Sequence, residues 1–158
     1  MIRPATQVDE EVVLDLARAF DRFGPYVQIF AAMLRGDHAA LAPYGVTGEL
    51  ALFVDEDGAG QRTGFVAVEW RERRVGHVHG VVVREAFRQR GVATLLLDHV
   101  VRLARERRIA TLECITAESD NVPALGCFTQ RGFRNVGHVG HYPLGQRAVR
   151  LRRELEGT

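Results

Sequence analysis

The sequence predicts an α/β protein in which one central sheet is covered by helices. Short β-branched or alternating apolar segments recur along the chain and are separated by turn residues, which is the pattern of strands. Between them lie longer stretches whose apolar residues repeat with the period of an amphipathic helix. The length of 158 residues fits one domain, so we expect residues 1–158 to fold as a single unit.

The composition is that of a globular protein and favours neither a nucleic-acid nor a membrane partner. Apolar residues make up 46% and charged residues 26% of the chain, and the net charge is only +1. A net charge this small produces no general attraction for nucleic acid. No apolar run is long enough to span a bilayer, and the N-terminus lacks the apolar segment of a secretion signal. We therefore expect a cytoplasmic protein.

All 21 residues counted as lysine or arginine are arginine, so the protein has no lysine side chain of its own to modify. In the cytoplasm Cys114 and Cys127 are expected to be reduced thiols. Buried cysteines usually serve as small apolar residues, and we expect that role here rather than a nucleophilic one. We expect no metal ion.

The N-terminal part predicts one strand and two helices. Residues 2–5 form a short first strand, and Thr6 or Asp9 can cap the helix that follows. The sequence Phe-Gly-Pro at 23–25 ends this helix. A second helix is predicted from Tyr26 to Leu41. Four large side chains in or just before this helix suit either a substrate pocket or plain core packing. They are Phe23, Tyr26, Phe30 and Met33.

Three strands follow. Residues 49–55 and 63–70 form a hairpin across the Asp57-Gly58 turn, and a charged turn at 71–74 leads into the strand 77–83. On a regular pleat, alternate residues of this last strand point to the same face. We therefore expect one face to carry His77, His79, Val81 and Val83.

The loop after this strand has the features of an anion site. Residues 88–93 are Arg-Gln-Arg-Gly-Val-Ala, and a helix is predicted from Gly91 to about Arg108. The first N–H groups of a helix have no intrahelical partner and lie at the positive end of its dipole. Glycine allows a phosphate to come close, and Arg88 and Arg90 add charge and hydrogen-bond donors.

The C-terminal part completes the sheet. Residues 110–116 form a strand, and a helix follows with Pro123 in its first turn and Gly132 at its end. Residues 134–154 supply two more strands, joined by the turn at 142–145.

Two motifs resemble those of the GNAT superfamily of N-acetyltransferases. Arg88-x-x-Gly91-x-Ala93 matches its Q/R-x-x-G-x-G/A signature. The segment from Asn121 to Phe133 is similar to its second signature, N-x-x-A-x-x-x-Y-x-x-x-G-F. The two histidines and the Phe-Arg-Gln run of residues 77–93 look most like the arylalkylamine N-acetyltransferase branch. The specific resemblance covers residues 77–133.

This resemblance implies a three-layer α+β fold. The GNAT sheet is mixed but mostly antiparallel, with six to seven strands, about four flanking helices and two central strands that splay apart. The co-substrate implied is acetyl-CoA, whose pantetheine arm lies in the gap. The residues expected to contact it are Val81, Val82, Val83, Arg88, Gln89, Arg90, Gly91, Val92, Ala93, Thr94, Asn121 and Phe128.

The implied reaction is transfer of the acetyl group to a primary amine by direct attack in a ternary complex. The amine must first lose a proton, and a neutral imidazole can accept one near neutral pH. His77 and His79 are the candidates for this base or proton relay, and Glu113 is the alternative. Phe128 departs from the family pattern, because the usual tyrosine there donates a proton to the CoA sulfur.

Several points stay open in the sequence. Either the thiolate leaves without a proton donor, or Tyr142, Ser119 or Cys127 takes the place of the missing tyrosine. The acceptor is a small-molecule amine, which we favour, or a peptide amine. Homodimers are common in the superfamily, so the resemblance is also compatible with a homodimer. Because of Phe128, an acyl-CoA-binding or regulatory module without turnover is the second hypothesis. A basic nucleic-acid-binding domain, based on the arginines at 105–108 and 147–153, is the third.

Overall fold

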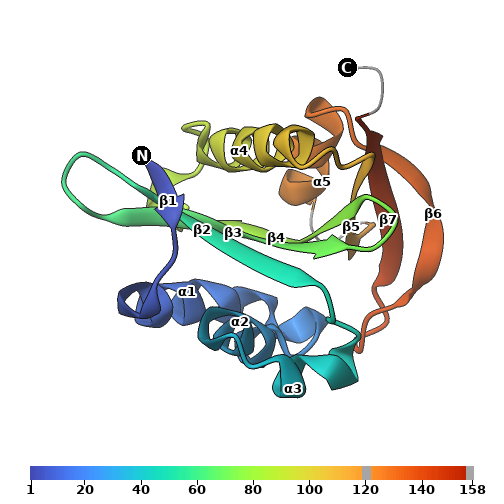
Figure 1. Ribbon diagram of the computed structural model, residues 1–158, viewed down its shortest axis with the longest axis horizontal. Coiled ribbons are helices and arrows are strands. Elements are labelled where there is room, and N and C mark those ends of the chain that lie inside the picture. The colour runs from blue at the N-terminus through green and yellow to red at the C-terminus, as the bar shows by residue number, and fades with distance from the viewer. Residues whose placement is uncertain (119–121, 156–158) are drawn as a thin grey trace.

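The computed structural model describes residues 1–118 and 122–155 (Figure 1). Its centre is a seven-stranded sheet in the order β1-β2-β3-β4-β5-β7-β6, in which every neighbouring pair is antiparallel except β4 and β5. The strands are β1 (Ile2–Pro4), β2 (Glu49–Glu56), β3 (Arg62–Arg71), β4 (Val75–Val83), β5 (Thr111–Ala117), β6 (Arg134–His141) and β7 (Arg147–Glu154).

Helices cover both faces of the sheet, and Figure 1 shows the three layers edge-on. One face carries α1 (Glu10–Ala17), α2 (Tyr26–Arg35) and α3 (His38–Leu41), and the other carries α4 (Val92–Glu106) and α5 (Val122–Gln130). We call these surfaces the α2 face and the α4 face. Each buries its own apolar core, and amphipathic helices are stabilised mainly by such burial. None of the described helices is long and apolar enough to cross a membrane.

The predicted architecture is confirmed, with one error in the helices. The segment 26–41 forms two helices rather than one, because Gly36 adopts φ 64° directly after α2. This left-handed conformation suits glycine and ends a helix. A short 3₁₀ segment, η2 (Arg18–Phe23), connects α1 to the break before α2.

The sheet opens between β4 and β5. The parallel pairing is short: Val75–Val78 of β4 pair with Thr111–Cys114 of β5. Beyond this point residues 80–83 still pair with β3, but their β5-facing edge has no strand partner within the described residues. The splayed central strands that the resemblance implied are therefore present, and they leave a gap through the sheet.

A β-bulge in β4 changes which face its side chains reach. Ala67 of β3 pairs with Gly80 and Val68 pairs with Val78, so His79 is the extra residue. An extra residue reverses the alternation that follows it. Val81 and Val83 consequently pack in the core of the α4 face. The expectation that these valines share a face with the two histidines is wrong, while the histidines themselves do lie together on the α2 face, with ring centroids 4.6 Å apart.

Candidate active site

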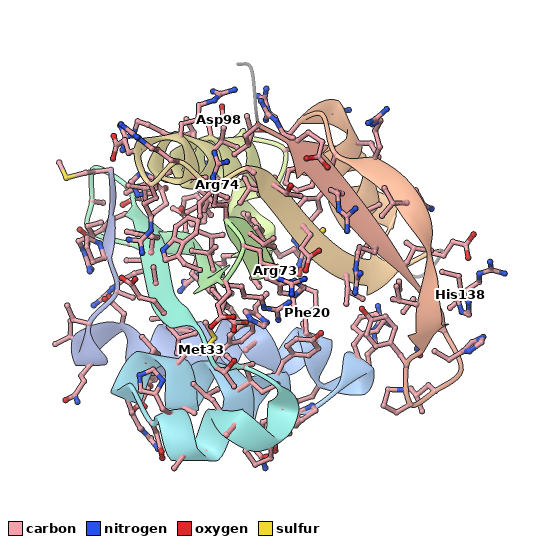
Figure 2. All side chains as sticks on the ribbon, turned by 45° about the vertical axis from the view of Figure 1, so that its right-hand side comes forward. Phe20, Met33, Arg73, Arg74, Asp98 and His138 are labelled. Carbon is pink, nitrogen blue, oxygen red and sulfur yellow. The ribbon has the colours of Figure 1, made fainter. Side chains whose placement is uncertain are left out.

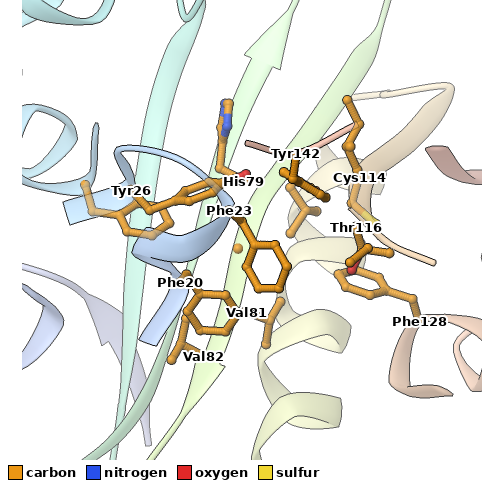
Figure 3. Close-up of a pocket in the computed structure, with 15 residues that line it drawn as sticks. Phe20, Phe23, Tyr26, His79, Val81, Val82, Cys114, Thr116, Phe128 and Tyr142 are labelled. Carbon is orange, nitrogen blue, oxygen red and sulfur yellow. The ribbon is translucent and has the colours of Figure 1, made fainter. Parts of the chain in front are cut away.

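A narrow pocket of about 50 Å³ passes through the gap between β4 and β5 (Figure 3). Its end on the α2 face is aromatic and its end on the α4 face lies against β5 and α5. A pocket that connects the two faces allows two substrates to meet from opposite sides. The residues that line it are Phe20, Phe23, Tyr26, Phe30, Val78, His79, Gly80, Val81, Val82, Cys114, Ile115, Thr116, Ala117, Phe128 and Tyr142.

Aromatic side chains from separate segments close the end on the α2 face. Phe23 of η2 contacts Tyr142 of the β6–β7 turn, with ring centroids 5.0 Å apart in an edge-on arrangement. Tyr26 hydrogen-bonds Tyr142, and burial raises the pKa of both phenols, so both stay protonated at neutral pH. Phe23, Tyr26 and Phe30 line the pocket as the sequence suggested, whereas Met33 packs in the core of the α2 face.

His79 is the imidazole that lines the pocket, and a buried glutamate holds it. Its Nε2 lies 2.8 Å from Oε1 of Glu69 on β3, a residue with no solvent exposure. Burial alone would raise the pKa of Glu69. Hydrogen bonds from His79 and the N–H of Gly48, together with the charge of Arg71, outweigh this and lower the pKa to about 2.

An ionised carboxylate can only accept hydrogen bonds. Nε2 of His79 therefore carries the proton and donates a hydrogen bond to Glu69. This tautomer leaves Nδ1 of His79 as a proton acceptor. The arrangement of a carboxylate that orients an imidazole is a common way to prepare a base. Sequence reasoning missed Glu69, although a single glutamate in the apolar strand 64–70 was a visible signal.

His77 lies behind His79 and outside the pocket lining. It is 6% exposed, and its Nδ1 lies 3.3 Å from Oε1 of Glu113 on β5. Burial lowers the pKa of His77 to about 4 despite the carboxylate beside it. The hydrogen bond from His77 in turn lowers the pKa of Glu113. His77 is therefore uncharged and Glu113 ionised at neutral pH, and the two form a buried pair.

The α4 face of the gap offers the groups expected for a CoA thioester. The β5-facing edge of Val81–Val83 is open. Gly91 with φ 81° is the N-cap of α4, whose first-turn N–H groups have no partner within the helix. Arg88 donates from Nε to the carbonyl of Val83, and the Arg90 guanidinium lies over the Phe87 ring. Phosphate-binding donors and an unpaired strand edge therefore adjoin each other.

Phe128 of α5 is buried, lines the pocket and packs edge-on against Phe133. Its wall position agrees with the expectation, but it brings no hydroxyl to the gap. Asn121, expected on the same wall, and Ser119, one of the substitute donors, lie outside the described residues. Of the two substitutes within the described residues, Tyr142 lines the pocket and Cys127 does not.

Both cysteines are free thiols, and burial raises the pKa of each. Cys114 is buried on β5 and Cys127 is half-buried on α5. A thiol whose pKa is raised contains little thiolate, so neither residue has the character of a nucleophile. This agrees with the packing role expected from the sequence.

The comparison with known families decides the class of protein. Residues 18–133 match the model of the acetyltransferase (GNAT) family. The chain belongs to the GNAT acetyltransferase family. As a member it is an acetyl-CoA-dependent N-acetyltransferase, and the open β4 edge and the α4 N-terminus fit that co-substrate. No curated protein sequence matches the chain.

Solved structures share the whole fold. An IAA acetyltransferase from Bacillus cereus is 18% identical, with a TM-score of 0.72 over 98% of this chain and 99% of its own. A ribosomal-protein-alanine N-acetyltransferase from Brucella melitensis is 21% identical, with a TM-score of 0.71 over 98% and 99%. Ard1 from Thermoplasma volcanium is 22% identical, with a TM-score of 0.78 over 98% and 97%. At these identities the likeness concerns the fold.

Proposed function

We propose that this GNAT protein acetylates the primary amine of a small molecule by direct attack in a ternary complex. The observation that supports this best is the pocket itself, which has a carboxylate-held imidazole at one end and the open β4 edge at the other. The amine would enter from the α2 face and the thioester from the α4 face. Residues 81–83, 88–94 and Phe128 would contact acetyl-CoA.

In the proposed reaction His79 is the base. Nδ1 of His79 takes a proton from the ammonium while Nε2 stays hydrogen-bonded to Glu69. The amine nitrogen then bonds to the acetyl carbon and the carbon–sulfur bond breaks. The nitrogen loses its second proton as the departing CoA sulfur gains one, so the products are the amide and CoA thiol. N–H groups on the unpaired edge of β4 would stabilise the carbonyl oxygen as it gains charge. His77 does not line the pocket, so we assign it a positioning role through its packing against His79.

Tyr142 is proposed to replace the missing tyrosine hydroxyl at position 128. It lines the pocket, its hydroxyl hydrogen-bonds Tyr26, and burial keeps it protonated. Tyr142→Phe should lower kcat by roughly 10²-fold, because the departing sulfur loses its proton donor, and should leave the KM for acetyl-CoA nearly unchanged. Steady-state kinetics would test this. Tyr26→Phe is the matched control, and an equal loss of kcat in both variants would rule out a specific role for Tyr142.

The function is tested by thiol release from acetyl-CoA with the purified protein across a panel of amines. We expect at least one class of small primary amine to raise the rate at least about tenfold above a no-amine control. The His79→Gln protein provides a second control. Protein that binds acetyl-CoA but releases thiol with no amine would instead support a binding or regulatory module, the alternative that Phe128 favours because it lacks a hydroxyl.

The finer assignments stay proposals. The two histidines on the α2 face support an arylalkylamine-type acceptor, and the aromatic residues at the pocket entrance suit an aryl group. The solved structures carry names of small-molecule and of ribosomal-protein acetyltransferases, and both remain acceptor classes for the panel. A cytoplasmic location and a homodimer stay predictions.

A further inference from the structure

A row of ionic side chains crosses the α2 face beside the pocket. Four residues lie in register on adjacent strands: Glu69 on β3, His77 on β4, Glu113 on β5 and Arg152 on β7. Arg150 pairs in register with Ile115, which lines the pocket. Because Val149 and Leu151 pack in the core of the α4 face, Arg150 and Arg152 project from the α2 face.

Two of the four arginines of β7, Arg150 and Arg152, are poorly matched by the carboxylates around them. Nε of Arg150 is 3.9 Å and Nη2 of Arg152 is 3.8 Å from Oε2 of Glu113, which is too far for a hydrogen bond. Glu113 instead accepts hydrogen bonds from Arg71 and His77. The Nε groups of Arg150 and Arg152 have no hydrogen-bond partner in the part of the chain that the structure describes.

The local charge therefore has a positive surplus. Arg71, Arg150 and Arg152 face Glu69 and Glu113, and His77 is uncharged because burial lowers its pKa to about 4. The side chains of Arg150 and Arg152 are 37% and 38% exposed, so part of each is open to solvent and ligands, while their Nε atoms are buried. Figure 2 shows the end of the β6–β7 hairpin lying beside the helices of the α2 face, where Tyr142 contacts Phe23.

We infer that the acceptor amine carries a carboxylate, which Arg150 and Arg152 bind while the amine enters the pocket. This rests on the proposed function and specifies its substrate class. A guanidinium matches a carboxylate with two parallel hydrogen bonds. Neighbouring strands are about 4.8 Å apart, so Arg150 on β7 stands one strand from the pocket wall at Ile115. A carboxylate a few bonds from the amine spans that separation.

The test uses matched amines in the thiol-release assay with the full-length protein and acetyl-CoA. One set is γ-aminobutyrate, butylamine and putrescine, and the other is alanylglutamate and alanylglutamine, both as C-terminal amides so that only the first carries a carboxylate. We expect the carboxylate-bearing member of at least one set to have a kcat/KM at least about tenfold above its matched amines, as one charged hydrogen-bonded contact provides. The double variant Arg150→Met with Arg152→Met should remove this preference. It should change the kcat/KM of the amines that lack a carboxylate less than about twofold.

Two further variants separate recognition from folding. Arg102→Met, on the exposed side of α4 across the sheet, should keep the preference. Arg150→Lys with Arg152→Lys keeps the charge and should restore part of it. Equal or better turnover of the amines that lack a carboxylate, or a preference that survives the methionine variant, would overturn the inference while leaving the proposed function standing. Turnover of no amine by protein that binds acetyl-CoA would overturn both.

Discussion

His79→Gln is expected to lower kcat by roughly 10²–10⁴-fold, the range that a general base contributes. Glutamine can still hydrogen-bond Glu69, but it accepts no proton from an ammonium near neutral pH. Because a general base takes up a proton during the reaction, the rate of the unmodified protein should depend on pH near neutrality, and this dependence should weaken in the variant. The measurement is kcat across a pH series at saturating acetyl-CoA.

Companion variants show whether His79 acts alone. His77→Gln should lower kcat less than about tenfold, because His77 lies outside the pocket lining, and adding it to His79→Gln should cost little more. Glu69→Gln removes the carboxylate that fixes the His79 tautomer and should lower kcat with little change in the KM for acetyl-CoA. A pH–rate profile that is the same in His79→Gln as in the unmodified protein would remove His79 from the mechanism.

The order of elements was predictable because each has a local signal. The strand 63–70 and the helix from Gly91 follow from apolar periodicity, and Gly132 with φ 85° ends α5 as its position suggested. The break at Gly36 also has a local sequence signal, which is the glycine inside a helical pattern. Such a glycine is tolerated in many helices, so the pattern alone favoured one helix over two.

The geometry of the site depends on contacts that are distant in sequence. The bulge at His79 shows only in the pairing with β3, and it decides that the histidines and Val81 face opposite sides. The same holds for the contact of Phe23 with Tyr142, which joins residues near opposite ends of the chain. Glu69 had a local signal as a charge within an apolar strand, but its partner His79 became visible only once β3 and β4 were paired.

Acidification should destabilise the folded protein through His77, and this is the largest effect on stability that we expect. The folded pKa of His77 is about 4 and its ordinary value 6.5, because burial disfavours the charged ring. Between these pH values the unfolded chain binds a proton that the folded protein does not. The free energy of unfolding therefore falls as the pH drops from 6.5 to 4. The full change amounts to about 3 kcal/mol.

Urea unfolding at a series of pH values between these limits measures this slope. In His77→Gln the slope should shrink to a small remainder, some of it from His99, whose pKa burial also lowers. His99→Gln is the matched control and should keep most of the slope, because His99 is much less buried than His77. Glu69 and Glu113 affect stability at lower pH than His77. Their pKa values are lowered in the folded protein, so the stability they provide is lost only below the ordinary glutamate value of 4.5. An unchanged slope in His77→Gln would mean that the ring takes up a proton in the folded state and is not held neutral beside Glu113.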